Sequence, residues 1–292
     1  MLSTLDLRGR AHSSAELLAL VPRAETEVAD ASAAAAKLID EVRSGGADAL
    51  LAHAERFDGV RPSAIRVPQA DIDRAVSELD PQLRAAVEET IARVRHASAA
   101  QVPASSHTEL DEGAVVEQRW VPVERVGVYV PGGKAIYPSS VVMNVVPAQV
   151  AGVASIALAS PVQAEFGGVH PVVLGVAGLL GVSEVYAMGG ASAIGAFAYG
   201  VPGIGLDPVS VVTGPGNVFV AAAKRLVAGV VGTDAEAGPT DILVIADESA
   251  NPRWVAADLL SQAEHDELAA AVLVTADAAW AERVLAELRS QA

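Results

Sequence analysis

The spacing of hydrophobic residues changes along the chain, from a helical period in the first part to alternating short runs later. In residues 25–100, apolar side chains recur with the spacing of one helix face, and glycine or proline interrupts them. The interruptions predict helices that end near residues 45–46 and at Gly59, followed by two helices separated at Asp80-Pro81. A short extended piece is expected at residues 65–67, between the two pairs of helices.

The first 25 residues predict a short amphipathic arm. Leucines at positions 2, 5 and 7 precede Ser13-Ser14-Ala15-Glu16, which fits a capping box at the start of a helix. The arm has too few apolar residues for a core of its own. It is therefore expected to dock on another part of the protein.

From Val115 onward, short apolar runs typical of buried strands alternate with segments of helical period. The runs VGVYV, VASIALAS, SEVYAMGG and VSVVT are each followed by a turn and a helix. Such alternation predicts a parallel, doubly wound sheet. Its glycine-rich turns fall at the carboxyl ends of strands, where sheets of this kind bind ligands.

Residues 237–275 predict one more strand-helix-strand unit. Asn251 and Pro252 fit an N-cap followed by proline at the first helical position. The helix that they begin carries Asp258, Gln262 and His265 on one face, at spacings of four and three. An amide oxygen and a neutral imidazole one turn apart can act as two ligands of a divalent metal. The alternative is a solvated helix face.

Composition narrows the class of protein. A chain of 292 residues has the length of about two domains, and with 51% hydrophobic but only 4% aromatic residues its core must consist mainly of Ala, Val, Leu and Ile. The net charge of −16 argues against a nucleic-acid partner. No cysteine is present, which excludes disulfides, thiolate catalysis and cysteine-based zinc clusters. Without a hydrophobic signal core or an apolar run of about 20 residues, the sequence predicts a cytoplasmic protein with no membrane span.

Two glycine turns are the candidate anion sites. Neither GxGxxG nor a glycine loop ending in Gly-Lys-Ser/Thr occurs, but Gly189-Gly190 and residues 214–217 (GPGN) have a related arrangement. Each ends a predicted strand and begins a predicted helix, so backbone N–H groups there can face an anion. The alternative is that both are tight turns without a ligand.

Longer motifs resemble one family, the histidinol dehydrogenases. The stretches are residues 125–153 (RVGVYVPGGKAIYPSSVVMNVVPAQVAGV), 213–225 (TGPGNVFVAAAKR), 237–247 (AGPTDILVIAD) and 258–275 (DLLSQAEHDELAAAVLVT), in the family's order. The resemblance implies an NAD-dependent, zinc-containing homodimer with exchanged segments. Such enzymes oxidise L-histidinol to L-histidine through the aldehyde histidinal with two NAD, in the last steps of histidine biosynthesis.

The resemblance also implies site residues. The family's NAD contacts match Tyr129, Ser192 and Asn217, but the family has glutamine where this chain has Ser192. Serine keeps a hydroxyl and loses the reach and the paired donor and acceptor of the amide. Weaker NAD binding or a changed cofactor position is the expected consequence.

Further positions match the family's substrate and metal site. Thr240 matches a substrate contact, and Gln262 and His265 match two zinc ligands that also lie at the substrate. The other two ligands, an aspartate and a histidine, and the catalytic Glu-His pair have no match in this sequence. The chain is accordingly expected to be the N-terminal two-thirds of such an enzyme and to be inactive by itself.

The expected architecture is α/β: two Rossmann-like, doubly wound parallel sheet units with a helical N-terminal arm. The predicted boundaries are residues 1–25 for the arm, 26–128 with 241–292 for a first domain, and 129–240 for a second. Two other functions are compatible with the sequence. One is an NAD-dependent dehydrogenase of another small amino- or hydroxy-alcohol, and the other is a non-catalytic dinucleotide-binding or oligomerisation module.

Overall fold

The chain divides into two compact units. The computed structural model describes residues 3–9, 11–20, 28–132, 136–235, 240–264 and 269–292. One unit, called here the sheet unit, comprises residues 28–238. The other, called the terminal unit, comprises residues 1–27 and 239–292. Each contains hydrophobic clusters of its own.

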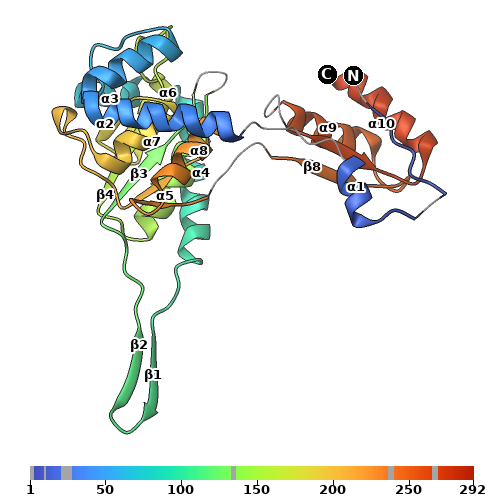
Figure 1. Cartoon of the computed structure of the whole chain (residues 1–292), viewed down its shortest axis with the longest axis horizontal. Helices are drawn as coiled ribbons and strands as arrows, with labels where there is room; N and C mark the ends of the chain where they lie inside the picture. The colour runs from blue at the N-terminus through green and yellow to red at the C-terminus, as the bar shows by residue number, and fades with distance from the viewer. Residues whose placement is uncertain (1–2, 10, 21–27, 133–135, 236–239, 265–268) are drawn as a thin grey trace. The chain divides into compact units, whose positions relative to one another are not determined.

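The sheet unit is built on five parallel strands in the order β5-β4-β3-β6-β7 (Figure 1). The strands are β3 (Arg125–Tyr129), β4 (Ser155–Ser160), β5 (Glu184–Ala187), β6 (Val211–Thr213) and β7 (Gly232–Thr233). The chain runs outward from β3 to β5 and then returns to the other side of β3, so the order reverses between β3 and β6. This arrangement confirms the predicted parallel, doubly wound sheet.

Helices cover both faces of this sheet, which explains why its strands are continuous apolar runs. One face, called the α7 face, is covered by α7 (Gly190–Tyr199) and α8 (Val218–Val227), and α2 (Val28–Asp58) packs on these two helices. The other, called the α5 face, is covered by α5 (Pro138–Val150) and α6 (Pro171–Leu179). On these helices pack α4 (Pro81–Ala99) and α3 (Gln69–Glu78), respectively. A short 3₁₀ helix, η1 (Pro202–Ile204), follows α7.

The predicted helix breaks are found with one modification. The first two helices are joined as α2, with a kink at Gly46, whose φ of 56° and ψ of −129° are not helical. Positive φ values favour glycine because it lacks a Cβ. At the other predicted break, Asp80 caps α4, where its side chain accepts from Gln82 N at 3.0 Å and Leu83 N at 2.9 Å.

The predicted extended piece at residues 65–67 pairs with β5. Val67 N donates to Val185 O at 2.8 Å, and Ala187 N donates to Ile65 O at 2.7 Å. A single antiparallel bridge joins Arg66 to Tyr186. These bonds satisfy backbone groups of β5 that an open edge strand would leave unpaired.

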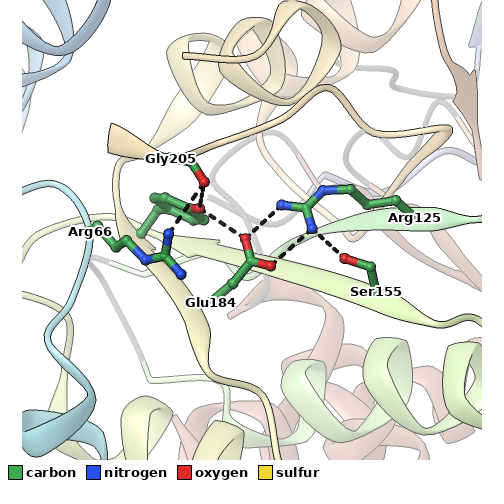
Figure 2. Close-up of polar contacts among 6 residues, drawn as sticks. Arg66, Arg125, Ser155, Glu184 and Gly205 are labelled. Carbon is green, nitrogen blue, oxygen red and sulfur yellow. Dashed lines mark hydrogen bonds and ion pairs between the residues drawn. The ribbon is translucent and has the colours of Figure 1, made fainter. Parts of the chain in front are cut away.

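A polar cluster fixes the amino ends of three neighbouring strands (Figure 2). Arg125, the first residue of β3, donates to both carboxylate oxygens of Glu184 on β5, at 3.0 and 2.6 Å, and to the hydroxyl of Ser155 on β4. The Tyr186 hydroxyl lies 3.0 Å from Glu184 Oε2 and from Gly205 O, and Arg66 also donates to Gly205 O. The hydrogen bond from Arg125 holds the pKa of Glu184 below its usual value.

An antiparallel hairpin projects from the sheet unit (Figure 1). It consists of β1 (Ser106–Asp111) and β2 (Ala114–Gln118), and every residue of both strands is exposed. Leu110, Val115 and Val116 are among the exposed apolar residues. A two-stranded hairpin without a packed face is marginally stable in water.

The terminal unit contains the predicted strand-helix-strand unit. Strands β8 (Ile242–Ile245) and β9 (Ala271–Val274) are parallel, and α9 (Pro252–Ala263) connects them. With α10 (Ala278–Gln291) they enclose a core of Val255, Ala256, Leu259, Trp280 and Val284.

Helix starts in the terminal unit follow the predictions. Asn251 caps α9, accepting from Arg253 N at 3.0 Å. The helix of the arm is α1 (Ser14–Leu20). Its capping box forms, because Ser13 N donates to Glu16 Oε2 at 2.7 Å and Glu16 N donates to Ser13 Oγ at 3.2 Å.

The division into units differs from the predicted one. Residues 26–128 were expected to join 241–292, but the helices from residue 28 to residue 99 belong to the sheet unit, where they pack on the helices that cover the five-stranded sheet. The physical reason is that α2 buries its apolar face, including Ala35 and Ile39, against α7 and α8. Among the helices that the structure describes, none is both long and apolar enough to cross a membrane.

Candidate functional site

The reversal of strand order places a candidate ligand site at the carboxyl ends of β3 and β6. These strands pair in parallel, with Val126 opposite Val211 and Val128 opposite Thr213. The helix after β3 lies on the α5 face, whereas the helix after β6 lies on the α7 face. In open parallel sheets, ligands bind outside the carboxyl ends of strands at such a switch point.

The GPGN turn, residues 214–217, follows β6 and passes directly over the end of β3. Gly214 has a φ of +116°, and a Cβ there would lie 2.0 Å from the carbonyl oxygen of Tyr129. A Cβ on Gly216 would lie 2.4 Å from Cβ of Val220. Glycine is therefore required at both positions, by the close approach to β3 and by the packing against α8.

Asn217 is exposed, as is Pro215 of this turn, and it caps α8. Its Oδ1 accepts from Phe219 N at 3.1 Å and from Val220 N at 3.2 Å. The amide oxygen is thus committed to the helix, and Nδ2 is the group that can donate to a ligand. The amino end of α8 also favours negative charge nearby, because its N–H dipoles are aligned.

Tyr129 connects the end of β3 to the start of α7. It is 5% exposed, and its hydroxyl accepts from Gly190 N at 3.1 Å. Burial raises the pKa of Tyr129 to about 12, so the hydroxyl is neutral near pH 7 and is no general base there. Both glycine turns are therefore connected to this one residue, through its side chain and through its carbonyl.

Ser192 is buried and already has a partner. It is 3% exposed, and its Oγ lies 2.8 Å from Nδ1 of His53, whose Nε2 lies 2.8 Å from Glu41 Oε2. His53 itself is 8% exposed, so it is a buried residue of α2. The face of α2 that carries it packs against α7, where two polar side chains satisfy both ring nitrogens.

Asp58, at the end of α2, is a titratable group that sequence reasoning missed. Burial raises its pKa to about 6, and a hydrogen bond from the backbone of Val162 partly opposes the rise. Its charge in turn contributes to the raised pKa of Tyr129. Nothing in the local sequence, RFDG at a helix end, distinguishes it from a solvated carboxylate.

In the terminal unit, two of the predicted site residues are in contact. Gln262 Nε2 donates to Thr240 O at 2.6 Å and lies 3.0 Å from Thr240 Oγ1. A carbonyl oxygen only accepts, so the amide nitrogen must face Thr240 and Oε1 must face the other way. An outward amide oxygen is the atom that a metal would take, so Gln262 fits the ligand role.

The predicted partner of Gln262, His265, lies outside the described residues. Within the described part of the chain, no cluster of three or more His, Asp or Glu side chains is placed to hold a metal ion.

Comparison with known proteins identifies the family. The sequence model of the histidinol dehydrogenase family matches residues 21–292. The chain is 62% identical to the histidinol dehydrogenase of Leifsonia xyli subsp. xyli over 292 residues, which is 100% of this chain and 67% of that protein. It is 56% identical to the Thermobifida fusca enzyme over 292 residues, 100% of this chain and 66% of that protein.

The fold agrees with the sequence. The crystal structure of histidinol dehydrogenase from Elizabethkingia anophelis matches with a TM-score of 0.86 at 32% identity, over 96% of this chain and 64% of that one. The chain belongs to the histidinol dehydrogenase family. It spans about two-thirds of the length of these relatives.

Family membership confirms the resemblance that four sequence stretches predicted. The site residues that the resemblance predicts are distributed over both units. In the sheet unit, Tyr129 contacts both glycine turns, and Ser192 lies in the first turns of α7. In the terminal unit, Thr240 and Gln262 are hydrogen-bonded.

The raised pKa of Asp58 predicts a pH-dependent stability. A carboxyl whose pKa is raised from 3.8 to about 6 on folding stabilises the fold fully below pH 3.8, and that contribution is lost as the pH rises through about 6. Asp58→Asn, which is neutral at every pH, should therefore raise the free energy of unfolding at pH 8 by about 1–2 kcal/mol, allowing for solvent screening. At pH 4 the two proteins should be equally stable.

Urea denaturation at the two pH values measures the difference. Asp48→Asn, on an exposed position of the same helix, is the control and should show no such pH dependence. Equal stability of Asp58→Asn and the parent at pH 8 would contradict the assignment.

Proposed function

We propose that this chain carries the dinucleotide-binding part and two metal ligands of an NAD-dependent histidinol dehydrogenase. The enzyme oxidises L-histidinol to L-histidine through histidinal, with two NAD. One observation carries the cofactor part of the proposal: the GPGN turn lies at the switch point of a five-stranded parallel sheet, against the end of β3. That is the position at which such sheets bind dinucleotides.

Asn217 is assigned the direct contact with NAD. It is exposed, its Nδ2 is the remaining donor, and the N–H groups at the start of α8 suit the negative phosphates. Tyr129 and Ser192 complete the assignment. Each hydroxyl already has one partner, Gly190 N for Tyr129 and His53 Nδ1 for Ser192, and each keeps hydrogen-bonding capacity for a ligand.

Gln262 and His265 are assigned as zinc ligands, with Thr240 at the substrate. The contact of the Gln262 amide nitrogen with Thr240 supports this, because it turns the amide oxygen away from Thr240 and leaves it available. When bound, zinc supplies a Lewis-acid centre that also orients the substrate. The contribution of this chain is to hold the glutamine oxygen and the Thr240 hydroxyl at one end of α9.

The 292 residues by themselves are not expected to convert histidinol. No histidine follows His265 in the sequence, and no Glu-His pair matching the family's catalytic residues is present. A dinucleotide-binding module without catalytic activity is the second candidate for this chain by itself. It is favoured by the fact that Tyr129, Ser192 and Asn217 all lie in the sheet unit, which has its own core.

NAD⁺ titration tests the cofactor assignment. Asn217→Ala should weaken binding by about 1 kcal/mol or more, which is about fivefold in Kd, because one hydrogen-bond donor is removed. The change also removes a helix cap, so a matched control is needed. Asn251→Ala removes the equivalent cap of α9 in the terminal unit and should leave the NAD⁺ affinity unchanged. Equal losses in the two variants would refute the role of Asn217.

Zinc titration tests the metal assignment. In a protein extended to the full length of these relatives, His265→Ala should lower zinc affinity about tenfold or more. Loss of a direct ligand should weaken zinc binding at least as much as loss of a residue that only hydrogen-bonds to a ligand. His96→Ala, on an exposed position of α4, is the control. The 292-residue chain should bind zinc weakly, because two ligands do not complete a tetrahedral site. Unchanged zinc content in His265→Ala would rule out this ligand.

We also propose that the protein is a homodimer in which the β1–β2 hairpin packs against the second copy. The hairpin has no buried residue, and burial of Leu110, Val115 and Val116 would stabilise it. Sedimentation equilibrium should show a dimer for the protein without substitutions and a shift toward monomer for Val116→Lys. Met143→Lys, at an exposed apolar position of α5, should remain dimeric. A monomeric parent protein would contradict the proposal.

A further inference from the structure

A buried lysine holds the GPGN turn from inside the protein. Lys224 of α8 is 1% exposed. Its ammonium group donates to Gly214 O at 2.5 Å, to Asp234 Oδ1 at 2.6 Å and to Ala235 O at 3.4 Å. An unpaired ammonium at this depth would be strongly destabilising, so these three acceptors account for its presence in the core.

Asp234 holds the same glycine from the other side. It follows the edge strand β7, and its Oδ2 accepts from Gly214 N at 2.8 Å. Both backbone polar groups of Gly214 are thus bonded to one ion pair. The residue is also held at a φ of +116° against the carbonyl of Tyr129, so its orientation is determined by three independent contacts.

The charges of Lys224 and Asp234 have a second consequence at the carboxyl ends of the strands. Lys224 neutralises the Asp234 carboxylate directly beneath a turn that would face the phosphates of a dinucleotide. If the lysine were replaced by an uncharged residue, Gly214 O would lose its charged donor. The carboxylate would also remain as an uncompensated negative charge near the ligand's phosphates.

We infer that the Lys224–Asp234 pair positions the GPGN turn for dinucleotide binding and screens the Asp234 charge from the phosphates. The inference rests on the proposed function, since it concerns the same site. Both are positioning residues, because they act through Gly214 and do not touch the ligand. Lys224 is the cation of an ion pair at the carboxyl ends of the strands, as Arg125 is at their amino ends.

The test compares Lys224→Met with Arg125→Met in the full chain, using NAD⁺ as the probe. Both changes remove the cation of an ion pair in the sheet unit, but Arg125 lies at the opposite end of the strands. Both should lower the midpoint of thermal unfolding. Only Lys224→Met should weaken NAD⁺ binding, by about tenfold or more. Lys224→Arg, which keeps a charged donor, should recover part of the affinity.

Salt dependence supplies a readout that a merely structural role would not change. Lys224→Met leaves a negative charge at the turn, so its loss of affinity relative to the parent should grow as ionic strength falls. Asp234→Ala leaves a positive charge, so its loss should shrink as ionic strength falls. Asp234 is a third exposed, and its replacement therefore provides a second variant if Lys224→Met does not fold.

The outcomes separate this inference from the proposed function. Binding by the parent with unchanged affinity in Lys224→Met and Asp234→Ala would overturn the inference and leave the proposed cofactor site intact. Equal loss of affinity in Arg125→Met and Lys224→Met would also overturn it, because general destabilisation would then explain both. No binding of NAD⁺ by the parent would overturn the proposed cofactor site together with the inference.

Discussion

The close approach of Gly214 to the carbonyl of Tyr129 is the constraint on which the candidate site depends. A Cβ on residue 214 would lie 2.0 Å from that carbonyl oxygen, which leaves no room for any residue other than glycine. The turn after β6 therefore packs directly on the end of β3. The side chain of the same tyrosine meets the start of α7 at Gly190. Three segments far apart in the sequence therefore meet at one residue, at the edge where parallel sheets bind ligands.

The amino and carboxyl ends of the strands are stabilised in different ways. At the amino ends, the side chains of Arg125, Ser155 and Glu184 link three strands and leave their backbones in regular pairing. At the carboxyl ends, Lys224 and Asp234 instead form hydrogen bonds with the backbone of the GPGN turn. The ammonium group of Lys224 is thus buried at the carboxyl ends of the strands, while Asn217 is exposed there.

Much of the fold could be predicted because helix breaks and strand alternation are local signals. The kink at Gly46, the cap at Asp80 and the parallel pair in residues 242–274 all follow from short sequence patterns. The division into units could not be predicted in the same way. The sequence of an amphipathic helix such as α2 shows that the helix needs an apolar partner, but it does not show which elements supply that partner.

The polar contacts of the site were the least predictable part. His53 and Ser192 are 139 positions apart, and only the packing of α2 on α7 brings them together. Lys224 did carry a signal: it lies four residues after Val220 and three before Val227, on the buried face of α8. A crystal structure of the chain with NAD⁺ tests the central claim most directly. We expect the dinucleotide at the carboxyl ends of β3 and β6, in contact with Asn217, and binding at any other place would contradict the account.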